Sequence, residues 1–271
     1  MKYILTTALL INLGTDISAQ VTIPTDAIVA EGRKLYHSEM ASWYGTDVFL
    51  EKFKDQQPEA GGYFSYEANG RFHCLFFSKS ADPETIAVIS FDSTYNVATA
   101  MVNADARPLT RFEKELYILR KKALEVLRSD TSIKYYRNIK LNLIPIIAGN
   151  EKKVFVLSAP IVEGVVVIGN DYQLSFDSLN NFTGLKRLHR NILPIKYNKD
   201  EGTVIQAMHT HLPETGDDIT STDICTLMLY SRFAGWNSHI VVSENRVSVW
   251  DCKKNTLLVI TRDAGKKTIK K

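Results

Sequence analysis

The stretch His209-Thr210-His211, followed by Thr220 and Asp223 at the head of an apolar run, constrains the fold more than any other part of the sequence. Side chains alternate along an extended segment, so two histidines one residue apart point to the same side of a strand. An aspartate in the first turn of the next helix can then face the same point. Two imidazole nitrogens, one carboxylate and an open fourth position are the arrangement of a catalytic zinc ion. We therefore expect His209, His211 and Asp223 to bind Zn²⁺; the competing interpretation is that one histidine packs against a neighbour and the other faces solvent.

The composition is that of a globular protein with a substantial core. The chain has 271 residues, of which 45% are hydrophobic and 23% charged, and such usage is typical of folded rather than disordered chains. This length fits one large or two modest domains. The net charge of +3 includes a basic tail at 263–271. No basic stripe interleaved with aromatic residues is present, so we expect no nucleic-acid partner.

Residues 1–19 have the pattern of a signal peptide. Lys2 precedes an apolar core from Tyr3 to Leu13, and Ala19 offers a small residue for cleavage before Gln20. This core is too short to span a membrane as a mature helix. We expect the mature chain to be exported, periplasmic or extracellular, without a transmembrane span. The competing interpretation is a buried N-terminal strand or helix.

The three cysteines, Cys74, Cys225 and Cys252, are too few for a disulfide framework. A bridge between Cys225 and Cys252 is one alternative in an oxidising compartment. Buried free thiols are the alternative that the sequence favours, because a free cysteine behaves as a small hydrophobic residue.

Residues 20–106 are expected to form a helix followed by an antiparallel meander. The helix starts near Thr25, where Thr25 or Asp26 caps it, and its apolar positions run from Ile28 to Trp43. Strands are expected at 63–66, 72–77, 86–91 and 97–102. Asn69-Gly70 lies between the first two strands and is a strong signal for a hairpin turn.

Residues 107–262 are expected to form a second region, again with antiparallel strands and flanking helices. The spacing of apolar residues predicts a helix over 107–128 and another over 224–233, the latter capped by Thr220 or Thr222. Strands are expected at 142–147, 154–159, 165–177, 185–194, 204–208, 240–243, 246–250 and 256–261. The strand that starts at Val165 should run beside the strand at 204–208. The fold class is therefore α+β, mainly antiparallel sheet with flanking helices.

This order of elements, with a strand ending in His-x-His and a helix beginning with Thr-x-x-Asp, resembles the JAMM metalloprotease motif on the MPN-type fold. The resemblance covers residues 107–262 and depends on four positions. His209, His211 and Asp223 match the metal ligands of the family, and Thr220 stands where the family has a serine that helps hold the tetrahedral intermediate. The proline that usually follows the second histidine is displaced by one residue, because Leu212 precedes Pro213.

The resemblance implies a zinc-dependent peptidase or isopeptidase-like hydrolase that acts on a protein or peptide substrate. In the family a glutamate on an earlier strand takes a proton from the zinc-bound water. Glu163 is the candidate for this base, because it leads the apolar strand that ends at Gly169. Glu163 also follows Pro160 closely, and the competing interpretation places it in an exposed turn.

Two other classes of function stay open: a non-catalytic MPN-like module that binds protein or peptide, and a structural envelope protein in which His-x-His is incidental. His189 and His239 are expected to be surface or hydrogen-bonded histidines rather than a fourth ligand. Glu214, Asp217 and Asp218 are expected to form a solvated acidic loop.

Overall fold

The computed structural model describes residues 25–197 and 206–262, and it confirms an α+β fold built mainly from antiparallel sheets. The proposed signal peptide, the basic tail and the first residues of the strand expected at 204–208 lie outside the described residues. None of the described helices combines the length and the apolar character that crossing a membrane requires.

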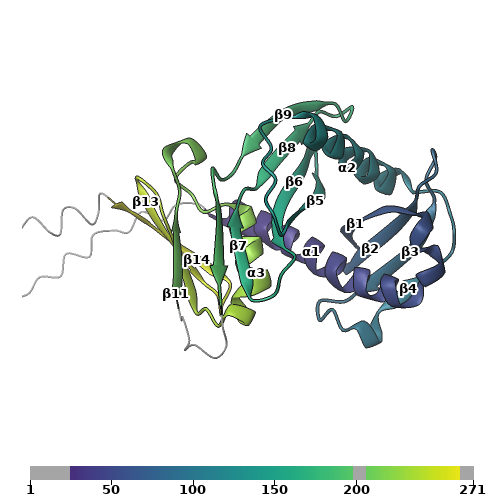
Figure 1. Ribbon diagram of the computed structural model, residues 1–271, viewed down its shortest axis with the longest axis horizontal. Coiled ribbons are helices and arrows are strands. Elements are labelled where there is room, and N and C mark those ends of the chain that lie inside the picture. Colours follow the sequence, from purple (N-terminus) through teal and green to yellow (C-terminus); the bar gives the residue numbers. More distant parts are fainter. Residues whose placement is uncertain (1–24, 198–205, 263–271) are drawn as a thin grey trace, which may run out of the picture.

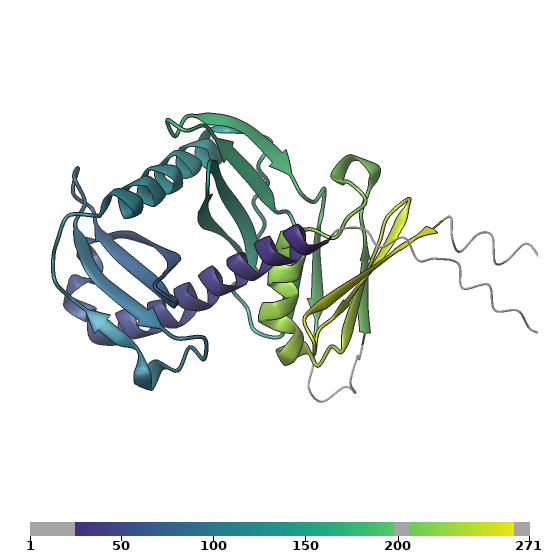
Figure 2. The ribbon, with the colours of Figure 1, turned by 180° about the vertical axis from the view of Figure 1, so that it is seen from behind.

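Helix α1 (Asp26–Lys52) runs through the middle of the molecule and contacts both of its ends (Figures 1 and 2). Its first half crosses helix α3 (Ser221–Ala234), and its second half covers the N-terminal sheet. The two helices meet closely because Gly32 has no side chain: a Cβ there would lie 2.7 Å from the Ile224 Cβ. The N-terminal and C-terminal regions of the chain therefore share this helix.

The N-terminal sheet has the order β1 (Ala60–Ala68), β2 (Arg71–Ser78), β3 (Thr85–Phe91) and β4 (Met101–Asn103), with every pair antiparallel. Asn69 and Gly70 form the expected turn between β1 and β2, with φ of 53° and 69°. A 3₁₀ helix, η1 (Lys54–Glu59), links α1 to this sheet. The strand expected at 97–102 is wrong in part, because Asn96 caps a second 3₁₀ helix, η2 (Val97–Thr99), and only the short β4 follows.

Helix α2 (Arg111–Ser129) begins at a capping box in which Thr110 and Glu113 bond each other's backbone. Its apolar face, including Leu119 and Ala123, packs on a second antiparallel sheet. This sheet has the order β5 (Ile139–Ala148), β6 (Glu151–Pro160), β8 (Tyr172–Phe176) and β9 (Phe182–Arg187).

Two smaller sheets lie beside α3 and complete the fold. Strand β7 (Val165–Gly169) pairs only with β10 (Ile192–Lys196) within the described chain. The other sheet has the order β11 (Gln206–Thr210), β12 (Ser238–Val242), β13 (Arg246–Asp251) and β14 (Thr256–Thr261). Strand β11 is parallel to β12 and lies at the edge, while the remaining pairs are antiparallel.

Two expected strands are each broken in the structure, and the breaks have a physical cause. Gly169 and Asn170 have positive φ, 92° and 59°, so the strand expected at 165–177 ends at Gly169 and restarts as β8. The strand expected at 185–194 is likewise split into β9 and β10 around His189. The expected pairing of the strand at Val165 with the strand at 204–208 is wrong, since β7 pairs with β10 and β11 with β12. All three cysteines are free thiols.

Candidate metal centre

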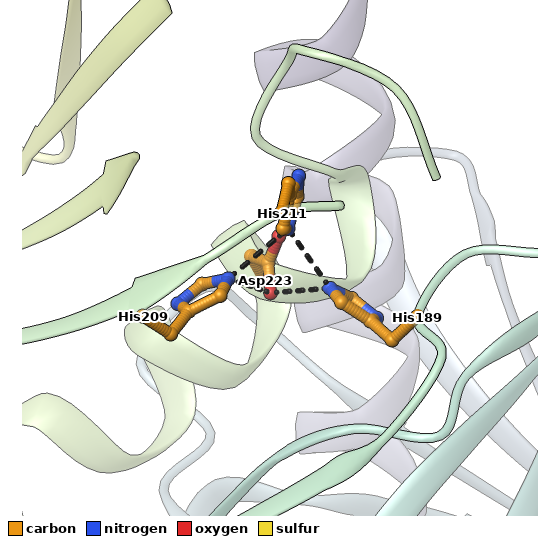
Figure 3. Close-up of side chains that lie close together, drawn as sticks. All are labelled: His189, His209, His211 and Asp223. Carbon is orange, nitrogen blue, oxygen red and sulfur yellow. Dashed lines mark hydrogen bonds and ion pairs between the residues drawn. The ribbon is translucent and has the colours of Figure 1, made fainter. Parts of the chain in front are cut away.

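His189, His209, His211 and Asp223 come together in one buried group, which we call the His/Asp centre (Figure 3). One ligand atom from each residue lies within 4.8 Å of the corresponding atom of every other. The group contains all three metal ligands expected from the sequence and adds His189. These four side chains could hold a metal ion.

Strand β11 delivers two of the imidazoles. His209 is the fourth of its five residues, and His211 continues the extended chain through a 2.9 Å hydrogen bond from its backbone N–H to the Val242 carbonyl. The alternation of side chains along this strand therefore puts both imidazoles on one side, as the His-x-His spacing predicts. Both side chains are buried, although β11 itself is an edge strand.

The first turn of α3 delivers the carboxylate. Thr220 is the N-cap: its hydroxyl accepts from the Asp223 backbone N–H at 3.0 Å and donates to Asp223 Oδ2 at 2.7 Å. The backbone N–H of Thr220 donates to the same oxygen at 2.9 Å. This capping box fixes the carboxylate, and it gives Thr220 a positioning role here. The role of Thr220 in holding an intermediate stays a prediction.

His189 enters from the segment between β9 and β10, where one continuous strand was expected. The break after β7 places Asp171 beside this segment, where its carbonyl accepts a 2.9 Å hydrogen bond from the Leu188 N–H. The backbone N–H of Asn170 donates at 3.0 Å to the Asn191 carbonyl on the other side of His189. His189 is thereby directed inward and is only 5% exposed. The expectation that His189 lies at the surface is wrong, and its ring is within reach of the other three side chains.

The separations within the centre are those of ligands around one small cation. His211 Nε2 lies 3.1 Å from His209 Nε2 and 3.2 Å from His189 Nε2. The Asp223 oxygens lie 3.1, 3.5 and 3.3 Å from the Nε2 atoms of His189, His209 and His211. With zinc–nitrogen bonds of about 2.05 Å, the edge of a tetrahedron of ligands is about 3.3 Å. Side chains at such separations could hold one metal ion, with Asp223 facing His189 and His209 through Oδ1 and His211 through Oδ2.

Two of the three imidazoles have an outer neighbour that favours the tautomer that metal binding requires, whereas His211 Nδ1 has no hydrogen-bond partner among the described residues. His189 Nδ1 lies 3.4 Å from Asp171 Oδ2, and His209 Nδ1 lies 2.8 Å from His239 Nε2. A proton on each Nδ1 leaves the Nε2 lone pairs directed at the centre, as in carboxylate–histidine–metal arrangements. His239 is thus a hydrogen-bonded histidine, as the sequence predicts.

The electrostatics of the centre also favour a cation. Burial disfavours the charged form of His189, but Asp223 and Asp171 outweigh it and raise its pKa to about 10. Burial lowers the pKa of His209 to about 3 and that of His239 to about 4. Burial also opposes the charge of Asp223, yet the surrounding histidines hold its pKa well below the usual value. At neutral pH Asp223 therefore stays ionised and pairs through Oδ1 with a protonated His189, so a bound metal ion would take the place of the His189 Nε2 proton.

A cleft of about 420 Å³ reaches the three imidazoles from outside. Its walls come from the ends of β7 and β10 on one side and from β11 on the other, with Ile192, Leu193 and Met208 among the apolar residues. His189, His209 and His211 are among the residues that line it. A ligand in this cleft could therefore approach a metal ion at the centre from the imidazole side.

Glu163 is not part of this group. It lies in an exposed turn before β7, whereas His189 lies near Gly169 at the other end of that strand. Val165 and Gly169 are four residues apart, which is about 13 Å of extended chain. The assignment of Glu163 as the base is therefore corrected: the turn after Pro160 puts it at the wrong end of β7.

Each of the three carboxylates in the acidic loop interacts with another side chain. Glu214 belongs to η3 (Pro213–Thr215) and forms a 2.8 Å ion pair with Arg190. Asp217 bonds Asn245 at 2.9 Å, and Asp218 pairs with Arg246. The described chain thus offers no unpaired carboxylate of this loop as a substitute base.

Comparisons of the chain with protein-family models, with curated proteins and with solved structures give no match. The interpretation of the centre therefore depends on its geometry and chemistry.

Proposed function

We propose that this protein binds one zinc ion at the His/Asp centre and presents it at the imidazole-lined cleft. The observation that carries the proposal is that His211 Nε2 lies 3.1 and 3.2 Å from the Nε2 atoms of His209 and His189, while the Asp223 carboxylate lies 3.1 to 3.5 Å from all three. Three imidazoles and one carboxylate suit zinc, which prefers nitrogen and oxygen ligands in a tetrahedron.

The resemblance predicts two histidines, one aspartate and an open fourth position, and His189 lies where the open position is expected. Four protein ligands are typical of a structural zinc site, and three are typical of a catalytic one. The position of Glu163 at the far end of β7 also favours a structural rather than a catalytic site, because the expected base is not beside the proposed metal. A non-catalytic metal-binding module is therefore the function that the geometry supports best, and the MPN resemblance stays a prediction.

Metal analysis of the purified chain tests the proposal. After reconstitution with zinc at neutral pH and removal of free metal, we expect about one zinc per chain. His189→Ala and Asp223→Ala should each weaken zinc binding steeply, because each removes one of the four protein ligands proposed for the ion. His73→Ala is the matched control, since His73 bonds Ser90 in the N-terminal sheet, away from the centre.

Cobalt provides a second measurement that does not depend on the folding of a variant. Co²⁺ in place of zinc should give the intense visible absorption of a tetrahedral site in the unmodified chain. A folded protein that takes up neither zinc nor cobalt would refute the proposal.

Hydrolysis of a peptide or isopeptide bond is a second candidate, and the cleft that reaches the imidazoles is the observation that favours it. Zinc at such a site polarises a carbonyl and lowers the pKa of a bound water. His189 would then have to leave the metal or share it with a fifth ligand. Zinc-dependent cleavage of peptide substrates that Asp223→Ala abolishes would support this candidate. A zinc-loaded protein that cleaves no such substrate would contradict it and would favour the non-catalytic metal-binding module.

A further inference from the structure

A second cavity, of about 950 Å³, lies at the other end of β7 from the His/Asp centre. We call it the aromatic pocket, and α1, α3, β1, β5 and the turn before β7 all contribute to it. Five aromatic rings line its walls: Trp43, Tyr63, Tyr197, Tyr230 and Phe233. Three carboxylates also line it, those of Glu39, Asp47 and Glu163, against one lysine, Lys140.

Four apolar residues that line the pocket are also strongly exposed. Trp43 is 43% exposed, Phe233 46%, Val162 43% and Ile161 62%. These four residues come from three segments, α1, α3 and the turn before β7, and they converge on one opening. Single exposed apolar residues are ordinary, but a contiguous group rimmed by charge marks a binding site.

The polar part of the pocket is organised around Glu39. Asn142 donates a 2.6 Å hydrogen bond to Glu39 Oε2, and Glu39 makes no ion pair within the described part of the chain. Burial raises the pKa of this carboxyl, with Asn142 opposing the shift. A carboxylate in such surroundings gains more from a cationic partner than one in water does, because the local dielectric is low.

Helix periodicity brings the acidic and aromatic groups together. Glu39, Trp43 and Asp47 are spaced by four residues on α1, so they lie on one face of the helix. Across the pocket, α3 supplies Tyr230 and Phe233, whose rings lie 6.1 and 6.2 Å from the Trp43 ring. Aromatic faces beside carboxylates are the chemistry that recognises ammonium and guanidinium groups, through cation–π attraction and ion pairing.

We propose that the aromatic pocket binds the ammonium or guanidinium group of a ligand, with Glu39 as the ion-pair partner and Trp43 as the aromatic wall. Neither zinc nor the His/Asp centre takes part, so a failure of the zinc proposal would not affect this one. A free alkylamine and a lysine or arginine side chain of a peptide share this chemistry.

Trp43 gives a direct readout of binding. The other two tryptophans, Trp236 and Trp250, are 4% and 0% exposed, so a ligand in the pocket meets only Trp43. Four probes are titrated against the full chain: n-butylamine, N-acetyl-lysine amide, N-acetyl-arginine amide and a pentapeptide with a central lysine. The neutral analogue N-acetyl-norleucine amide tests the need for charge. Fluorescence is paired with calorimetry, so that Trp43→Ala can also be measured.

We expect saturable binding of the cationic probes and at least tenfold weaker binding of the norleucine analogue. Glu39→Gln should weaken binding about tenfold, because it removes the charge but keeps an acceptor for Asn142. Trp43→Ala should weaken it several-fold. Glu51→Gln is the matched control, an exposed glutamate on the same helix outside the pocket; it should bind as the unmodified chain does.

The pattern across the probes identifies the source of the cation. Binding of n-butylamine and both amino-acid amides indicates a free amine or guanidine, and binding of the pentapeptide alone indicates a peptide side chain. Absence of binding by every cationic probe up to about 10 mM would overturn the proposal. Equal binding of the norleucine analogue, or binding that folded Glu39→Gln leaves unchanged, would overturn it as well.

Discussion

Glu113 is a buried carboxylate whose charge stabilises the start of α2, and its replacement by glutamine tests that inference. Arg107 pairs with both of its oxygens at 2.8 Å, and the Tyr66 hydroxyl and the Thr110 backbone N–H each donate to it at 2.7 Å. Burial opposes the ionised form, but these hydrogen bonds outweigh it and lower the pKa from 4.5 to about 2. Each pKa unit corresponds to about 1.4 kcal/mol, so the shift contributes at most about 3 kcal/mol at neutral pH.

The expected loss for Glu113→Gln at pH 7 is about 2 kcal/mol, because Arg107 is 38% exposed and solvent screens its part of the interaction. The folded-state pKa lies below the unfolded value, so the stabilisation is complete above about pH 4.5 and disappears as the pH falls toward 2. At pH 3.5 the difference between the two proteins should already be smaller by about 1 kcal/mol. The free energy of unfolding is measured by urea titration at both pH values in the presence of a chelator.

Glu125→Gln, an exposed change on the same helix, is the control and should have no effect beyond about 0.5 kcal/mol at either pH. A difference between Glu113→Gln and the unmodified chain that is equally large at pH 7 and pH 3.5 would refute the electrostatic argument. The side chain would then act through packing alone.

Two further predictions concern the His/Asp centre. Asp171→Asn should weaken zinc binding about 10- to 100-fold, because it removes the carboxylate that orients the His189 imidazole. Glu163→Gln is its control and should leave the zinc affinity unchanged. Competition with a chromogenic chelator measures both affinities, and equal losses would contradict the role given to Asp171. Gly32→Ala should destabilise the chain by about 1 to 2 kcal/mol and also weaken zinc binding, since the added Cβ presses on Ile224 in the turn that carries the aspartate ligand. Gly45→Ala is its control on the same helix: it clashes in the N-terminal core and should lower the unfolding free energy without changing zinc affinity.

The elements with strong local signals could be predicted from the sequence. The helix at 107–128 has a regular apolar stripe and a Thr-x-x-Glu capping box, and the structure places α2 at Arg111–Ser129. Asn69-Gly70 likewise specifies its turn through local backbone preference. Pairing between distant strands carries no such signal. The expected neighbours of β7 were therefore wrong, although the strand itself was found.

Three of the four residues of the His/Asp centre could be predicted because each has a periodic position. The His-x-His spacing places both imidazoles on one side of a strand, and the Thr-x-x-Asp spacing places the aspartate in the first turn of a helix. His189 has no such spacing to a partner, since it precedes His209 by twenty residues and lies between two strands. Only the break in the apolar run at Asn170-Asp171 hinted that the chain reverses there.

That break also explains why the expected base, Glu163, is not the carboxylate that lies beside His189. The expected pairing was of one continuous strand, Val165 to Asp177, with the strand at 204–208. In that arrangement Glu163, at the start of the strand, was the carboxylate expected nearest to the two histidines. Because the backbone turns at Gly169 and Asn170, a second buried carboxylate, Asp171, lies beside His189 and is not among the residues that line the cleft. Glu163 instead contributes to the aromatic pocket at the opposite end of β7. One strand therefore has a candidate metal centre at its C-terminal end and a candidate cation pocket at its N-terminal end, and ligands of the two sites would not compete for the same residues.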